Sequence, residues 1–103
     1  MEVIIKPSKT KNKKFDAIIN GERKISFGQA GASDYTIHKN PKRKERYIAR
    51  HKKNENWGKS GVDSAGWLSR FILWEKPSLK GAIDNANKKY ADVKFKLSKS
   101  IKN

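Results

Sequence analysis

Residues 15–27 read FDAIINGERKISF and contain the clearest structural signal of the chain. Two apolar-rich runs, residues 15–19 and 24–27, flank the dipeptide Asn20-Gly21. Asn-Gly between such runs is the strongest short-range signal for a β-hairpin, because both central positions of a type I′ turn need a positive φ. The stretch therefore predicts two antiparallel strands joined by a tight turn.

A third strand is expected at the N-terminus. Residues 2–6 carry a β-branched run, which is typical of strands, and Pro7 closes it. The segment between this strand and the hairpin is rich in lysine, and we expect it to be a flexible basic arm (Lys9, Lys11, Lys13 and Lys14). After the hairpin, residues 28–33 read GQAGAS and predict a plain connector, because their two glycines lack the spacing of a phosphate-binding loop.

Three helices are expected next. Asn40 as the capping residue and Pro41 as the first helical residue predict a helix over 41–53, with a thin apolar stripe around Tyr47. Residues 65–74 are apolar over most of a helix circumference, which is typical of a core helix. Pro77 breaks that helix and is expected in the first turn of a third helix, over 77–90.

The last predicted element is a half-buried strand, because Val93, Phe95 and Leu97 alternate with polar residues. The expected fold class is therefore α+β: a small N-terminal antiparallel sheet with a hairpin at Asn20-Gly21, about three helices and a C-terminal strand. We expect one domain over residues 1–98 and a flexible basic tail over 99–103.

Composition excludes several classes of protein. The chain has 103 residues, 25 Lys and Arg against 10 Asp and Glu, and a formal net charge of +15. It has no Cys, which excludes disulfides and zinc–cysteine sites. Ten aromatic residues argue against a disordered basic tail. We expect no membrane span and no secretory signal peptide, because the apolar runs are too short. A surface this basic favours an anionic partner.

The basic charge is concentrated between residues 38 and 60, where nine Lys and Arg face two Glu, a local charge of +7. Arg43, Arg46, Arg50 and Lys53 have spacings that place them on one side of a helix. Such a row can follow successive phosphates, so the pattern predicts backbone-directed binding of DNA or RNA with little sequence preference. The candidate nucleic-acid-binding residues are Lys39, Lys42, Arg43, Arg46, Arg50, Lys53, Trp57, Lys59 and Arg70.

Alternatives stay open at this point. Trp57 can stack on a base, or it can plug the loop onto the core. The basic surface can instead bind acidic protein, as in a minor capsid or assembly protein. A third hypothesis is a small nuclease in which His38 and His51 act as acid and base. We assign no catalytic residue, cofactor or metal ligand, because two histidines without a carboxylate pattern do not define a metal site.

The ordered motifs resemble a known family. They include KISFG at 24–28, GASDYT at 31–36, RYIARHKK at 46–53 and AGW at 65–67. Over about residues 1–90, the chain resembles an uncharacterised family of small basic proteins encoded by large nucleocytoplasmic DNA viruses and some bacteriophages. The resemblance implies a viral setting, in the virion or the interior of the infected cell. It implies no activity, but small basic virus proteins often coat genomes or sit inside capsids.

Overall fold

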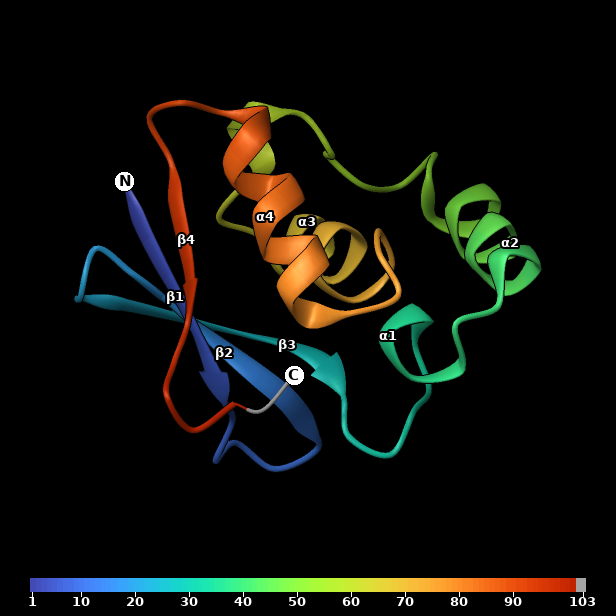
Figure 1. The fold of residues 1–103 in the computed structure, drawn as a ribbon, viewed down its shortest axis with the longest axis horizontal. Coiled ribbons are helices and arrows are strands. Elements are labelled where there is room, and N and C mark those ends of the chain that lie inside the picture. The colour runs from blue at the N-terminus through green and yellow to red at the C-terminus, as the bar shows by residue number, and fades with distance from the viewer. Residues whose placement is uncertain (102–103) are drawn as a thin grey trace.

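Four strands form one sheet in the order β3-β2-β1-β4 in the computed structural model, which describes residues 1–101 (Figure 1). Strand β1 (Glu2–Pro7) pairs antiparallel with β2 (Lys13–Ile19), and β2 pairs antiparallel with β3 (Arg23–Gln29). Strand β4 (Lys94–Leu97) lies parallel to β1 on the other side. The predicted α+β class and the predicted C-terminal strand are confirmed.

The β2–β3 hairpin turns at the predicted dipeptide. Asn20 has φ 52° and Gly21 has φ 72°, so both turn residues occupy the left-handed region that the Asn-Gly signal anticipates. Ile19 pairs with Arg23 across the turn. This register directs Ala17 and Ile19 of β2 into the core, where both are buried.

The helical part begins with an element that the sequence analysis missed, the one-turn helix α1 (Tyr35–His38). The predicted helix beginning at Pro41 is confirmed as α2 (Pro41–His51), although it ends two residues earlier than expected. A 3-10 turn, η1 (Lys59–Gly61), lies in the loop that follows.

The predicted core helix over 65–74 has two parts. The helix α3 (Ala65–Leu68) continues directly into a π-helical turn, η2 (Ser69–Leu73). The next helix, α4 (Leu79–Lys89), begins after Pro77, so the expectation that Pro77 occupies its first turn is wrong. Ser78 caps α4 instead, because its Oγ accepts a hydrogen bond from the N–H of Gly81 at 3.0 Å.

The core lies between the sheet and the α3–α4 side of the molecule (Figure 1). Trp67 is completely buried, with its ring 4.6 Å from that of Phe71 and stacked on Phe95 at 5.5 Å between centroids. Because Trp67 comes from α3 and Phe95 from β4, this stack joins the helical layer to the last strand. No helix within residues 1–101 is long and apolar enough to cross a bilayer.

The lysine-rich segment before the hairpin is folded. Asp16 is buried, and it accepts hydrogen bonds from the hydroxyls of Ser8 at 2.7 Å and Ser26 at 2.6 Å. Burial raises the pKa of Asp16, but these hydrogen bonds outweigh it and leave the pKa below its usual value. Lys13 and Lys14 belong to β2, so the expectation of a flexible arm is wrong for these two residues.

The C-terminal segment is described as far as residue 101. Ile101 packs against the core, and its N–H donates to the carbonyl of Ser98 at 3.1 Å. Residues 102 and 103 of the predicted basic tail lie outside the described residues.

Candidate nucleic-acid interface

The helix α2 carries the densest group of basic residues. Its start is fixed locally, because the Asn40 side chain accepts hydrogen bonds from the N–H groups of Lys42 at 3.0 Å and Arg43 at 3.4 Å. The helix holds one carboxylate, Glu45, and five cations: Lys42, Arg43, Lys44, Arg46 and Arg50. A helix with this composition buries only a narrow stripe.

The buried stripe of α2 consists of the Tyr47 ring and the half-buried Lys44 side chain. Tyr47 is the buried residue of α2, and its ring stacks on Trp74 with centroids 4.3 Å apart and an interplanar angle of 3°. Burial raises the pKa of Tyr47 to about 12. Beside it, Lys44 Nζ donates to the Glu75 carbonyl at 2.8 Å and lies 3.4 Å from the Glu75 carboxylate. These contacts orient α2, so its arginines remain exposed.

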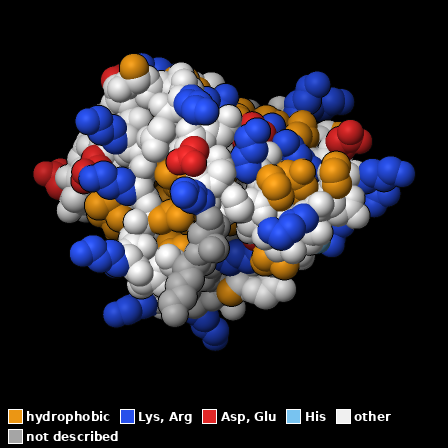
Figure 2. Space-filling model, viewed as in Figure 1, with side chains coloured by type: hydrophobic (Ala, Val, Ile, Leu, Met, Phe, Trp, Pro, Cys, Tyr) orange, Lys and Arg blue, Asp and Glu red, His pale blue; other side chains and the backbone are white. Residues whose placement is uncertain are grey.

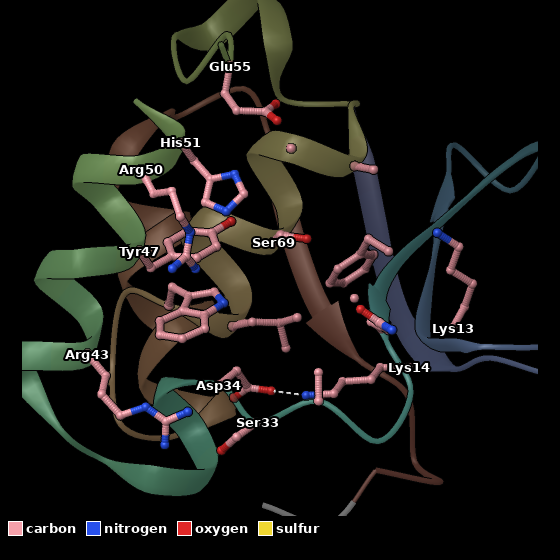
Figure 3. A pocket seen from close by; sticks show the side chains of 18 residues that line it. Lys13, Lys14, Ser33, Asp34, Arg43, Tyr47, Arg50, His51, Glu55 and Ser69 are labelled. Carbon is pink, nitrogen blue, oxygen red and sulfur yellow. Dashed lines mark hydrogen bonds and ion pairs between the residues drawn. The ribbon is translucent and has the colours of Figure 1, made fainter. Parts of the chain in front are cut away.

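A pocket of about 550 Å³ lies between α2 and the rest of the domain (Figure 3). Arg43, Arg50 and His51 reach it from α2, whereas Lys13 reaches it from β2 on the opposite side. Ser33 and Ser69 add hydroxyl groups to its lining. Helix α2 and the sheet therefore present cations to one shared cavity.

One of the two carboxylates in the pocket is already neutralised. Asp34 is almost fully buried and pairs with Lys14 Nζ at 2.5 Å. The same carboxylate caps α1, accepting from the N–H of Thr36 at 2.9 Å and from its hydroxyl. The other carboxylate, Glu55, lies on the opposite side of the pocket from Asp34 (Figure 3). The other charged residues of the lining are the cations Lys13, Arg43 and Arg50.

The structure brings some of the predicted residues together. Arg43 and Arg50 line the pocket. Lys42 and Arg46 are exposed on the same helix, and Lys53 is exposed in the turn that follows it. Figure 2 shows Lys and Arg side chains spread over the visible face, with few Asp and Glu between them.

Three other predicted cations have partners within the protein. Lys39 Nζ donates to the carbonyls of Thr36 and Pro77. Lys59 pairs with Asp92 at 2.8 Å. Arg70 has a side chain only 12% exposed and pairs with Glu75 at 2.8 Å, so it does not face solvent as a phosphate contact requires.

Trp57 is half-buried and packs against the core. The Arg70 guanidinium lies 5.4 Å from its ring centroid, and its indole N–H is buried without a partner in the described part of the chain. These contacts favour the interpretation of Trp57 as a hydrophobic plug over that of a base-stacking residue.

The two histidines do not form an acid–base pair. His38 contacts Trp74, Trp74 stacks on Tyr47, and Tyr47 contacts His51, so two rings lie between the imidazoles. His38 Nδ1 accepts from the N–H of Asn40 at 2.9 Å. Burial, assisted by the charge of Arg43, lowers the pKa of His38. Residues 1–101 contain no group of three metal-ligating side chains.

Lys13, Ser33 and Ser69 line the pocket but were not predicted as site residues from the sequence. Its place in the lysine-rich segment did mark Lys13 as a cation that could bind an anion, but that segment was expected to be flexible. No sequence signal marks the serines, because the pocket forms only when β2, α2 and η2 meet.

Comparisons with known proteins add one similarity. Residues 3–51 match a family of unknown function, DUF5754. The match spans β1 through α2, and so covers both the hairpin and the basic helix. Neither the curated proteins nor the solved structures contain a significant match. The similarity therefore extends over the sheet and α2 sides of the pocket, and it stops before α3 and η2.

Proposed function

We propose that this protein binds nucleic acid through the phosphate backbone. The contact surface would be the exposed side of α2, with Lys42, Arg43, Arg46 and Arg50, together with Lys53 and the cations of the pocket. Since phosphates repeat along every sequence, such contacts fix position without reading bases. The three arginines can also bind phosphate oxygens in a bidentate way, which lysines cannot.

One observation carries this proposal: in the part of the chain that the structure describes, these arginines have no carboxylate partner. Asp34, Asp63, Glu75 and Asp92 each pair with other cations, and Glu75 pairs with both Arg70 and Lys44 of α2. Within residues 1–101, no ion pair involves Arg43, Arg46 or Arg50. Exposed, unneutralised cations on one helix repel one another, and an anionic partner relieves that repulsion.

The setting implied by the family resemblance is part of the proposal. A small basic protein of a large DNA virus or phage would meet its nucleic acid in the infected cell or in the virion. The match to DUF5754 is consistent with any setting, because that family has no assigned function.

The test is a charge reversal measured against labelled double-stranded DNA, single-stranded DNA and RNA. For the wild-type protein, neutralising about six phosphates predicts an affinity that falls about 10³-fold between about 50 and 200 mM salt. Changing Arg43, Arg46 and Arg50 together to Glu should abolish saturable binding. Unchanged tryptophan fluorescence would show that the fold is retained.

A matched control has the same change in net charge elsewhere. Lys80, Lys88 and Lys96 are exposed and lie on α4 and β4, away from the pocket. Changing these three to Glu should weaken binding far less. Equal losses in the two triple variants would contradict the placement of the surface. Weak, nonsaturating binding by the wild type would contradict the function and favour an acidic protein partner, as expected of a capsid or assembly protein.

A further inference from the structure

The pocket differs from the exposed side of α2 because its wall is partly apolar. Phe27, Leu73 and Trp74 line it together with Arg43 and Arg50. Phe27 and Leu73 belong to the core and are almost fully buried, whereas Trp74 is half-buried and keeps an exposed part of its ring. A concave site with apolar walls and a few convergent polar groups is the usual form of a small-ligand site. This combination suits a ligand that carries both a flat ring and a phosphate.

The charged side chains are unevenly distributed along the pocket. Figure 3 shows Arg43 and Asp34 at one end and Glu55 at the other, with Arg50 between them. Because Lys14 neutralises Asp34, the end near Arg43 is cationic. Glu55 repels an anion from the opposite end. A phosphate is therefore favoured near Arg43 and Arg50.

Two departures from regular structure shape the wall facing α2. Ser69 and Leu73 line the pocket from the π-helical turn η2, an irregularity that is frequent at functional sites. Opposite them, Gly28 has φ 76°, and a Cβ there would lie 2.9 Å from Leu73 Cδ1. A larger residue at this position would push into the lining. Gly28 and the π-helical turn therefore meet on this side of the pocket, at Leu73.

A pocket that holds one base favours single-stranded nucleic acid over a duplex. Its volume of about 550 Å³ is within the usual range for small-molecule sites. A base in a duplex is stacked and paired, and extruding it costs a few kcal/mol. An unpaired base can enter a pocket without that cost.

We propose that the pocket receives one unpaired nucleotide of a bound single strand. The base lies against the half-buried Trp74, and its phosphate lies near Arg43 and Arg50. This inference rests on the proposed function, since the rest of the strand would follow the basic side of α2. It predicts a preference for single strands over duplexes of about tenfold, equivalent to the contribution of one held base.

The experiment fills the pocket and compares two probes, a labelled oligothymidylate of about 12 nucleotides and a labelled hairpin duplex of similar charge. Ser69→Leu and Ala32→Trp each place bulk in the lining, Ser69 from η2 and Ala32 from the exposed loop after β3. Ser100→Leu is the matched control, at an exposed position near β4. Fluorescence anisotropy should show about tenfold weaker binding of the single strand by both pocket variants. Duplex affinity and the control should stay at the wild-type level.

The outcomes separate this inference from the proposed function. Equal wild-type affinity for both probes, unaffected by either pocket variant, would overturn the nucleotide site and leave backbone binding intact. Absence of saturable binding to both probes would overturn the proposed function and the inference with it. If Ser69→Leu does not fold, Ala32→Trp still decides the question, because Ala32 is exposed.

Discussion

The two sides of the pocket are built in different ways. The body, made of the sheet with α3, η2 and α4, buries large apolar side chains such as Trp67, Leu68 and Ile72 completely. Helix α2 buries only Tyr47, which stacks on Trp74, and is also held by the contacts of Lys44 with Glu75. Most of the folding free energy therefore comes from the body.

The arginines follow the same division. In the body, Arg23 pairs with Asp63, Lys59 with Asp92 and Arg70 with Glu75. On α2, the arginines have no such partner in the described part of the chain. One chain thus combines a body with a large apolar core and paired arginines, which provides stability, with a lightly anchored helix whose arginines are left free to bind.

The largest effect is expected from Trp67→Ala in the body. Trp67 is completely buried and contacts Phe71, Tyr90 and Phe95. Removing a buried aromatic side chain typically costs about 3–5 kcal/mol of the free energy of unfolding. That is a large part of the stability of a small domain. Urea unfolding followed by circular dichroism would measure the loss.

Trp57→Ala is the matched control, since Trp57 is half-buried at the edge of the core. We expect it to lose less than half as much stability as Trp67→Ala. Similar losses in both variants would contradict the view that stability is concentrated in the core between the sheet and the α3–α4 side.

The sequence predicted the individual strands and helices better than the site, because the signals for these elements are local. Asn20-Gly21 specifies its own turn, and Asn40 with Pro41 specifies the start of α2. The alternation of Val93, Phe95 and Leu97 likewise identifies β4 without knowledge of its neighbour. In each case the residues that carry the signal are the residues that adopt the structure.

The rest depends on contacts between distant residues. The parallel pairing of β4 with β1 joins opposite ends of the chain, which no local pattern encodes. Helix α1 is a single turn, capped by Asp34, and Asp34 is held in turn by Lys14 of β2. The π-helical turn at Ser69 has the periodicity of an ordinary helix in sequence. The pocket also depends on contacts between distant residues, because its cations come from β2 and α2.

The second prediction concerns pH at the junction between α2 and the body. His38 packs on Trp74, and burial with the charges of Arg43 and Lys14 lowers its pKa, against the opposing effect of Asp34. The unfolded chain then binds a proton at a pH where the folded chain does not. Stability should therefore be constant above about pH 7 and fall as pH drops through about 6.5, by at most about 1.4 kcal/mol per pH unit.

Thermal unfolding between about pH 7.5 and 5 would measure this dependence. The carboxyl groups of Asp16 and Glu75, whose pKa values are lowered, affect stability only at more acidic pH. His38→Asn should remove the slope, because asparagine can still accept from the Asn40 N–H but does not titrate. His51→Asn, the control, should retain it. A slope that survives His38→Asn would assign the effect to another group.

The smallest effects come from single arginines, one on each side of the division. Arg23 pairs with Asp63 where both side chains are well exposed, so Arg23→Gln should cost no more than about 1 kcal/mol of stability. It should leave nucleic-acid affinity nearly unchanged. Arg50 has no carboxylate partner among residues 1–101, so Arg50→Gln should leave stability unchanged.

For Arg50→Gln the expected change is in binding, measured as affinity for a single strand at several salt concentrations. Loss of one phosphate contact should lower the slope of log affinity against log salt by about 0.7 and weaken binding about fivefold near physiological salt. Because both variants remove one positive charge, a general effect of net charge would weaken binding equally in each. If Arg23→Gln lowers only stability and Arg50→Gln lowers only affinity, stability and binding depend on different parts of the molecule. Equal losses of affinity would instead show that the whole basic surface binds and that α2 has no special role.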